Sequence, residues 1–314
     1  MAQSSQSLLR QGFGFLNRAR LGFSKHVYVG AGGIGDDLMC STVFRELRRR
    51  HVHGIVFTTR APDLFQGNPD LDVVIPQKNS RFDRWLREGL EFTRLGYGHY
   101  HPETDKDDAP NEHVLAALCR VAGISGPIKL RPYLHLTPKE RTAGRLAENQ
   151  IIVQSSAQSA TFAVRNKEWI PGRFQEVCDH LRSGNSLIQI GASQDPKLEG
   201  AVDLRGQTSL RQSAAILANA LVFIGLEGLL MHLARAVDCR SVIIYGGRLR
   251  PWQIGYAGNS NLIGDTACSP CWLRSRCDYQ HECMKMIEPE AVIRAVESQL
   301  AKKSETLEVE EFVI

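Results

Sequence analysis

The sequence predicts an α/β protein made of two Rossmann-like domains that face each other across a central cleft. Short apolar segments suited to parallel strands alternate along the chain with amphipathic helical segments, which is typical of this fold class. The alternation starts twice, after residue 24 and again near residue 150. The length of 314 residues, of which 43% are hydrophobic, is enough for two medium-sized cores.

The first series of elements predicts a domain over residues 25–148. It opens with a βαβ unit, for which we expect a strand at 25–30, a helix at 37–50 and a strand at 54–59. The later elements are a strand at 73–75 and helices at 81–90 and 111–122. Residues 99–110, which are rich in Asp, His and Pro, predict a mobile surface loop. The proline-bounded stretch 131–138 marks the break between the two series.

The second series predicts a domain over residues 149–303. Its short apolar runs suit parallel strands, and we expect these at 151–154, 186–190, 221–225 and 241–245, with helices at 209–219 and 229–237 between them. The tail at 304–314 is acidic and then apolar. We expect it to be a disordered end or a contact with another subunit of a homo-oligomer.

Residues 1–24 form a separate N-terminal arm. The arm combines leucines and phenylalanines with Arg10, Arg18 and Arg20, and a basic amphipathic segment of this kind can lie in a lipid headgroup layer. The alternative is a helix or arm packed on its own domain. Three glycines within it would weaken any helix.

Composition restricts the compartment and the partners. The 38 Lys and Arg residues against 34 Asp and Glu leave a formal charge of only +4, so we expect no binding to nucleic acid. Nothing resembles a cleavable signal peptide, and no apolar run is long enough to span a bilayer. We therefore expect a cytoplasmic protein whose eight cysteines are reduced.

A glycine-rich turn follows the first strand. Gly30, Gly32 and Gly35 have the spacing of a dinucleotide-binding loop, but Asp36 and Asp37 come directly after them. Two carboxylates would repel a pyrophosphate at this helix start, by about 1 kcal/mol per charge pair at ~4 Å even in water. The second strand also ends near Arg60 rather than at an acidic residue. An NADP-dependent oxidoreductase is therefore a weak alternative.

The aspartates after the turn have two interpretations. Asp36 could be a general base that the glycines bring close to an acceptor. Either residue could instead cap the helix, since Asp is a preferred N-cap residue. We expect Asp37 to be the cap and Asp36 to carry the chemistry.

Several segments together resemble glycosyltransferase family 9, the ADP-heptose:lipopolysaccharide heptosyltransferase group. The matching segments are residues 35–36, 67–75, 166–174, 203–210, 227–236 and 241–247. This resemblance implies a GT-B architecture, with the acceptor bound mainly by the first domain and the nucleotide-sugar by the second. It also implies inversion at the anomeric centre, with Asp36 as the general base. Lys167, which matches a K-x-W motif, would neutralise the leaving diphosphate.

The remaining candidates for donor binding form two groups in the second domain. One group comes at the end of its first strand, and the other lies around the start of the helix expected at 229–237. Gln154, Ser155 and Ser156 could donate to phosphate oxygens, or form an ordinary polar loop. Family members typically carry Asp-Thr/Ser-Gly before a helix that has a histidine three residues after the glycine. Here Glu227, Gly228 and Leu229 stand in those places, and His232 keeps its position. Donor binding at the helix start stays possible, although His232 could also be a core histidine.

Four cysteines lie within sixteen residues of one polar segment. Cys268, Cys271, Cys277 and Cys283 could surround one tetrahedral zinc or iron ion, or they could be free thiols like the other four. The segment 268–283 resembles the iron-binding finger of heptosyltransferases that modify autotransporter adhesins. A metal held by four protein ligands would be structural. His281 could replace one of the cysteines.

These observations predict an inverting glycosyltransferase that moves a heptosyl group from ADP-heptose to a bacterial glycolipid or protein acceptor. If the N-terminal arm binds lipid, the enzyme would lie peripherally on the cytoplasmic face of the inner membrane. The altered segment around Glu227 also permits a non-catalytic relative that has kept the fold as a binding or assembly partner.

Overall fold

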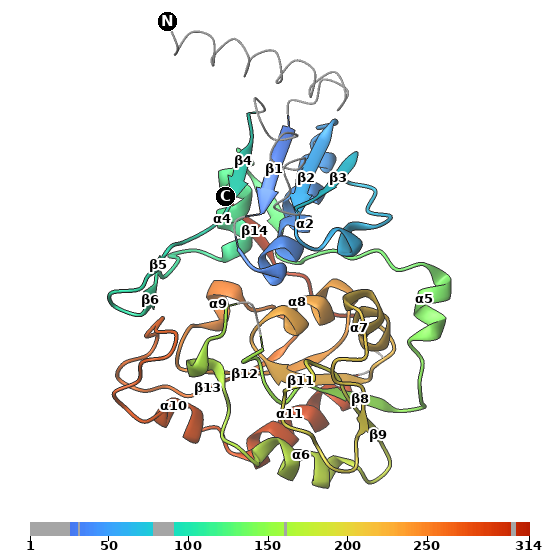
Figure 1. Cartoon of the computed structure of the whole chain (residues 1–314), viewed down its shortest axis with the longest axis vertical. Helices are drawn as coiled ribbons and strands as arrows, with labels where there is room; N and C mark the ends of the chain where they lie inside the picture. Colours follow the sequence, from blue (N-terminus) through green and yellow to red (C-terminus); the bar gives the residue numbers. More distant parts are fainter. Residues whose placement is uncertain (1–25, 31, 78–90, 160–161, 303–305) are drawn as a thin grey trace, which may run out of the picture.

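The computed structural model describes residues 26–30, 32–77, 91–159, 162–302 and 306–314. Most of the β-strands in these ranges form two parallel sheets, one in each half of the chain, which lie one above the other in Figure 1. The predicted N-terminal arm and the helix expected at 81–90 lie outside the described residues.

The first sheet has four parallel strands in the order β3-β2-β1-β4. These strands are β1 (His26–Gly30), β2 (Ile55–Thr59), β3 (Val73–Pro76) and β4 (Thr93–Leu95). Within the described residues, the helical segments of this half are α2 (Ile34–Arg49), η1 (Pro62–Phe65) and α4 (Val114–Val121). The βαβ unit expected at the start is therefore confirmed, since β1 and β2 pair in parallel with α2 between them.

The second sheet has six strands in the order β10-β9-β8-β11-β12-β13, and all of its pairs are parallel. The strands are β8 (Gln150–Val153), β9 (Ser186–Gln189), β10 (Val202–Asp203), β11 (Val222–Leu226), β12 (Ser241–Gly246) and β13 (Ser260–Ile263). The helical segments are η2 (Arg165–Lys167), α6 (Arg173–Leu181), α7 (Leu210–Leu217), α8 (Leu229–Ala236), α9 (Pro251–Ile254), α10 (Glu282–Lys285) and α11 (Pro289–Ala301). All four strands expected in this half are confirmed.

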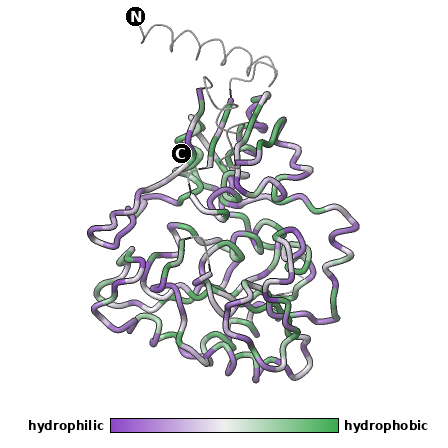
Figure 2. The backbone as a smooth tube through the Cα atoms, in the orientation of Figure 1, coloured by the Kyte–Doolittle hydropathy of each residue, from purple (hydrophilic) through white to green (hydrophobic). Residues whose placement is uncertain are grey.

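One hydrophobic core joins the two halves. It contains Phe44 and Phe57 from the first half together with Phe223 and Met231 from the second. Helices α2 and α8 pack against each other at this junction. A second core fills the opposite face of the six-stranded sheet, beneath α6 and α11. Figure 2 shows the hydrophobic segments gathered in the strands and the hydrophilic ones along the outer connections.

The connection between the halves contains a short helix that the sequence did not predict, α5 (Pro138–Ala143). Thr137 caps this helix by accepting a hydrogen bond from the Glu140 N–H, and the Glu140 carboxylate accepts one from the Thr137 N–H in return. The boundary at 148/149 lies between α5 and β8 and stays a prediction.

The loop expected at 99–110 is held rather than mobile. It contains the two-stranded hairpin β5 (Tyr100–His101) and β6 (Lys106–Asp107). Lys106 forms a β-bridge with Leu273 of the second half, and the Asp107 N–H donates to the Trp272 carbonyl. Hydrogen bonds to a distant segment, which local composition does not reveal, fix this loop.

The C-terminal tail is also ordered where the structure describes it. Strand β14 (Glu311–Val313) pairs antiparallel with β7 (Pro127–Lys129), so the chain returns to its first half at its end (Figure 1). The expectation of a disordered end was wrong for residues 306–314, because their alternating apolar side chains complete a two-stranded ribbon. No helix within the described ranges is long and apolar enough to cross a membrane.

Candidate active site

A cavity of about 610 Å³ lies between the two halves. The first half contributes residues 32–36 of the glycine turn and residues 95–100 after β4. The second half contributes Lys167, the start of α8 and residues of the cysteine segment. Of the predicted site residues, Asp36, Lys167, Glu227, Gly228 and His232 all line this one cavity.

Asp36 is the third residue of α2, and its carboxylate accepts two hydrogen bonds. One comes from the Gly33 N–H at 2.6 Å and the other from the Tyr97 hydroxyl at 2.9 Å. Burial raises the pKa of Asp36, while these two donors and the charge of Lys167 act in the opposite direction. The site therefore contains a partly buried carboxylate held in a fixed orientation next to open space.

Asp37 has a different environment from the one that we expected. The N-cap residue of α2 is Gly33, so the prediction that Asp37 caps this helix was wrong. Its carboxylate accepts hydrogen bonds from the Thr59 hydroxyl at 2.7 Å and from the Arg60 N–H at 3.2 Å. Burial raises the pKa of Asp37 to about 6. Asp37 thus ties the start of α2 to the end of β2.

The glycines of the turn make room for these carboxylates. A methyl group at Gly30 would collide with the Asp37 carboxylate, and one at Gly32 would collide with the Asp36 carboxylate. The protein's own acidic groups therefore occupy the space beside the turn, where a dinucleotide fold would bind pyrophosphate. This geometry argues against the oxidoreductase alternative.

Lys167 and Glu227 form an ion pair on the other side of the cavity. Lys167 ends η2, and Glu227 lies in the turn between β11 and α8. Burial opposes the charged form of Glu227, but the Lys167 ammonium outweighs it and keeps the pKa of Glu227 below its usual range. Gly228 has a φ of 152°, a conformation that favours glycine at this helix start.

His232 lies in the first turn of α8 and forms a hydrogen bond between its Nδ1 and the Tyr256 hydroxyl at 2.6 Å. Burial lowers the pKa of His232 to about 4, so its ring is neutral at pH 7. Its Cδ2 atom would lie 3.4 Å from a methyl group added at Gly35. His232 thus lines the cavity and also packs α8 against the glycine turn.

Gln154, Ser155 and Ser156 are not among the residues that line the cavity. Gln154 donates to the Ser156 carbonyl, and the buried Ser155 hydroxyl donates to the Pro196 carbonyl while it accepts from Gln189. These polar groups connect β8 to neighbouring loops of its own domain. Their predicted contact with a donor phosphate stays a prediction.

Sequence reasoning missed several residues of the cavity wall. Tyr97 holds Asp36, and Arg248 and Arg274 both donate to the carboxylate of Asp107. Arg274 also lies over the ring of Tyr100, 3.8 Å from its centroid. These contacts join residues more than sixty positions apart, and no local pattern in the sequence indicates them.

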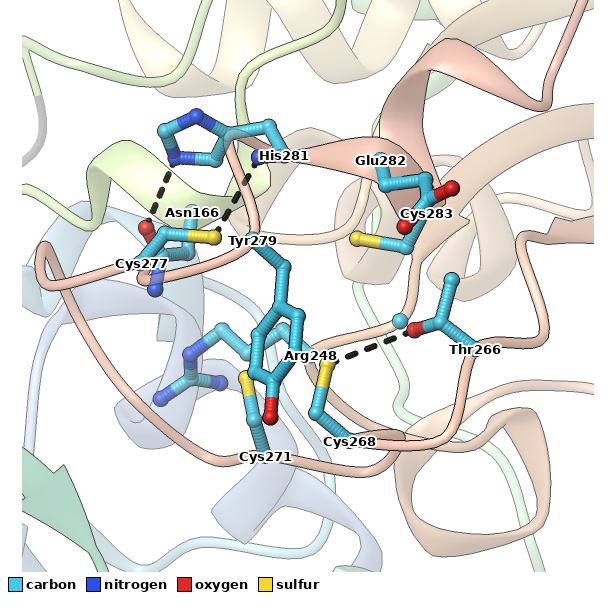
Figure 3. A pocket seen from close by; sticks show the side chains of 11 residues that line it. Asn166, Arg248, Thr266, Cys268, Cys271, Cys277, Tyr279, His281, Glu282 and Cys283 are labelled. Carbon is cyan, nitrogen blue, oxygen red and sulfur yellow. Dashed lines mark hydrogen bonds between the residues drawn. The ribbon is translucent and has the colours of Figure 1, made fainter.

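The four cysteines of the segment 268–283 line one small cavity of about 20 Å³, shown in Figure 3. The His281 N–H donates to the Cys277 sulfur at 3.3 Å. Burial raises the pKa of Cys271 and of Cys283, and the backbone of Leu273 and of Gly247 acts in the opposite direction. The volume is close to that of one small ion or water. Four thiols and this N–H donor fit a zinc or iron ion in their chemistry.

The side chains do not converge on a single point. In the ranges that the structure describes, no group of three or more His, Cys, Asp or Glu side chains is arranged to hold a metal ion. The thiols would therefore have to turn toward a common centre to bind one. The His281 ring bonds to Asn166 instead of pointing at the sulfurs. Cys40, Cys119, Cys178 and Cys239 are buried and outside this cluster.

Comparison with known proteins agrees with the fold. Residues 129–277 match the model of glycosyltransferase family 9 (heptosyltransferase). A stretch of 131 residues is 29% identical to lipooligosaccharide heptosyltransferase 2 of Campylobacter jejuni and covers 40% of this chain and 37% of that protein. The chain thus spans little more than a third of the length of the curated relatives that it matches.

Two solved structures are similar over most of the chain. The E. coli ADP-heptose lipopolysaccharide heptosyltransferase II superposes with a TM-score of 0.66 at 16% identity and covers 90% of this chain and 100% of its own. The iron-containing dodecameric glycosyltransferase TibC of enterotoxigenic E. coli superposes with a TM-score of 0.67 at 20% identity, covering 90% and 77%. The chain has the GT-B fold of these two structures, and residues 129–277, somewhat less than half of the chain, match the model of glycosyltransferase family 9.

Proposed function

We propose that the protein is an inverting glycosyltransferase that moves a heptosyl group from ADP-heptose to a hydroxyl of a bacterial glycolipid or protein. The observation that supports this most directly is the position of Asp36 and Lys167 in one cavity, on opposite halves of the chain. The family match supports the reaction class. The similar fold of TibC, which has been solved in complex with ADP-D-beta-D-heptose, supports the donor class.

In this mechanism Asp36 takes the proton from the acceptor hydroxyl. The freed oxygen attacks the anomeric carbon of the donor, and the bond from that carbon to the diphosphate oxygen breaks with inversion. Hydrogen bonds from Gly33 and Tyr97 orient the Asp36 carboxylate for this step. The raised pKa, caused by burial, makes the carboxylate a better proton acceptor.

Lys167 faces the charge that develops on the leaving diphosphate. Its side chain is mostly buried, and electrostatic stabilisation is worth more in such a site than in water. The first N–H groups of α8, after Gly228, are available to phosphate oxygens at the helix start. The neutral ring of His232 adds a polar group without adding charge.

We further propose that Cys268, Cys271, Cys277 and Cys283 hold a structural zinc or iron ion. The donor set, the small cavity and the His281 N–H that donates to the Cys277 sulfur support this assignment. The metal would supply a cross-link that orders the segment beside the active site. Metal analysis of the purified protein, compared with a Cys271→Ser variant, tests this proposal.

We also propose a cytoplasmic location and a homo-oligomeric state. The first rests on the composition, and the second on the dodecameric state named for TibC. Peripheral contact with the inner membrane would depend on the N-terminal arm. Sedimentation velocity of the full chain tests the oligomeric state, and vesicle flotation with and without residues 1–24 tests the membrane contact.

The Asp36→Asn variant tests the main proposal. Asn keeps the size and the hydrogen-bond acceptor but cannot take a proton, so we expect heptosyl transfer to fall by about 10²- to 10⁴-fold. ADP affinity, measured by calorimetry, should stay unchanged. The matched control is Asp179→Asn on the exposed side of α6, where Asp179 is half exposed. Unchanged transfer in Asp36→Asn would remove Asp36 from the mechanism.

Calorimetric titration of the wild-type protein with ADP also tests the competing function, a non-catalytic binding or assembly partner. The Lys167 ammonium is already paired with the Glu227 carboxylate. If no ligand displaces Glu227 from this pair, the arrangement favours a non-catalytic protein. Absence of ADP binding in the wild-type protein would support that alternative.

A further inference from the structure

Asn166, the residue before Lys167, makes its hydrogen bonds to the cysteine segment. Its N–H donates to the Arg274 carbonyl at 3.0 Å, and its Nδ2 donates to the carbonyls of Leu273 at 3.2 Å and Arg276 at 2.8 Å. His281 Nε2 donates to its Oδ1 at 3.0 Å. Only 4% of Asn166 is exposed. Asn166 therefore makes all of these hydrogen bonds, as donor and as acceptor, to the cysteine segment 268–283.

The chemistry of these contacts requires an amide. An aspartate would turn a carboxylate oxygen toward two carbonyl oxygens, and an alanine would leave both carbonyls without this donor. The two carbonyls also fix which end of the amide faces His281. Asn166 thus anchors η2, the turn that carries Lys167, to a loop more than one hundred positions away.

The anchor continues to the thiol cluster. The His281 N–H donates to the Cys277 sulfur at 3.3 Å, as Figure 3 shows. One chain of contacts thus runs from Cys277 through His281 and Asn166 to the backbone of Lys167. The same segment also supplies Trp272 and Arg274 to the wall of the active-site cavity.

We propose that Asn166 is a positioning residue that sets the place of the Lys167 ammonium by anchoring its turn to the cysteine segment. This inference rests on the proposed role of Lys167 at the donor diphosphate. Without the Asn166 side chain, η2 loses its hydrogen bonds to Leu273, Arg276 and His281. It keeps the backbone bond from Asn166 to Arg274 and its own bonds from Lys167 to Val164 and from Glu168 to Arg165. The ammonium should then sample positions away from the diphosphate.

A double-mutant cycle with ADP as the calorimetric ligand tests this proposal. We expect Lys167→Ala to weaken ADP binding about tenfold or more, which is the range for a hydrogen bond to a charged group. Asn166→Ala should weaken it about tenfold with Lys167 present, and less than about twofold in the Lys167→Ala background. Such coupling is what a residue that acts through Lys167 produces.

Two further measurements separate positioning from general damage. The control Asn185→Ala removes a partly buried hydrogen bond to the Leu181 carbonyl in the second domain, away from η2, and should leave ADP affinity unchanged. If Asn166→Ala does not fold, His281→Asn takes its place. Asn tolerates the φ of 55° at this position but is too short to reach Asn166, so it should weaken ADP binding in the same coupled way.

The outcomes distinguish the two proposals. Additive losses in the cycle, or full ADP affinity in both Asn166→Ala and His281→Asn, would overturn the positioning role and leave the proposed function intact. Full ADP affinity in Lys167→Ala would overturn the positioning role together with the proposed contact between Lys167 and the diphosphate, while transfer by Asp36 would still be tested by Asp36→Asn. Coupled losses with an unchanged thermal unfolding midpoint support the positioning role.

Discussion

The ammonium of Lys167 pairs with the carboxylate of Glu227 inside the active-site cavity, where 19% and 4% of the two side chains are exposed. The two charges belong to different segments of the second domain, and both act on Asp36 across the cavity. Lys167 lowers the pKa of Asp36, while Glu227 raises it. A donor diphosphate that binds Lys167 must therefore compete with Glu227 for the same cation.

We expect Glu227→Gln to tighten ADP binding. Gln keeps the size of the side chain but removes the charge that competes with the diphosphate, and a gain of about tenfold is reasonable for a partly screened charge pair. Calorimetric titration with ADP measures this gain, with Glu199→Gln, which is exposed on the surface, as the control. Weaker binding would instead mean that Glu227 helps to hold the donor.

The pH dependence of transfer should move in Tyr97→Phe. Burial raises the pKa of Asp36, and the Tyr97 hydroxyl lowers it by donating to the ionised carboxylate. Phe removes that donor, so the pKa rises further. A general base works only when ionised, and activity is lost as the pH falls through its pKa. The acidic limb of the kcat profile should therefore move to higher pH.

The matched control for this variant is Tyr133→Phe. Tyr133 packs between Arg45 and Arg131, away from the cavity. Its replacement should leave the profile in place. An unmoved acidic limb in Tyr97→Phe would mean that the limb does not report Asp36.

Much of the fold could be predicted because its signals are local. The alternation of apolar strands with amphipathic helices indicated the parallel sheets, and the glycines before Asp36 indicated a tight turn against a carboxylate. The partners of these groups could not be predicted in the same way. Tyr97 meets Asp36 across sixty-one positions, and Asn166 meets His281 across 115, so only the tertiary fold brings them together.

The errors have the same physical cause. Composition predicted mobility for residues 99–110, yet Asp107 is bound by two arginines of the second half. Ser155 was predicted as a phosphate ligand because it follows a strand; its hydroxyl bonds within its own domain, and its contact with a donor stays a prediction. A polar residue in a loop signals a hydrogen bond, but it does not say whether the partner is a ligand or the protein.

Asp37 should make stability depend on pH. Its pKa is about 6 in the folded protein because of burial, against about 3.9 in the unfolded chain. The folded state therefore binds this proton more tightly. The resulting stability is fully present below pH ~4 and is lost as the pH rises through ~6, by about 3 kcal/mol at most.

Asp37→Asn should remove this dependence. Asn keeps an oxygen for Thr59 and Arg60 but does not titrate. Urea unfolding between about pH 4.5 and 7 should show that the free energy of unfolding of the variant falls less with rising pH than that of the wild type. Parallel curves for the two proteins would contradict the assigned pKa.

Arg211 should hold the two halves of the molecule together. From α7 its guanidinium donates to both oxygens of Glu140 at 2.6 and 2.7 Å and to the carbonyls of Asp63 and His135. Lys cannot reproduce this fork of donors. We expect Arg211→Lys to lower the free energy of unfolding by about 1 to 3 kcal/mol, measured by urea denaturation. Arg182→Lys, which changes an exposed arginine, should have no measurable effect.

The C-terminal strand should stabilise the first half of the chain from a distance in sequence. Removing residues 306–314 takes away the only partner of β7 within the described residues, and also the Glu308 carbonyl that accepts from the buried guanidinium of Arg235. We therefore expect faster hydrogen exchange at residues 127–130 and a lower unfolding midpoint. Glu308→Ala is the matched control, because it keeps the carbonyl and loses only an exposed side chain. Equal protection at 127–130 in the truncated chain would show that β7 is held by its own half alone.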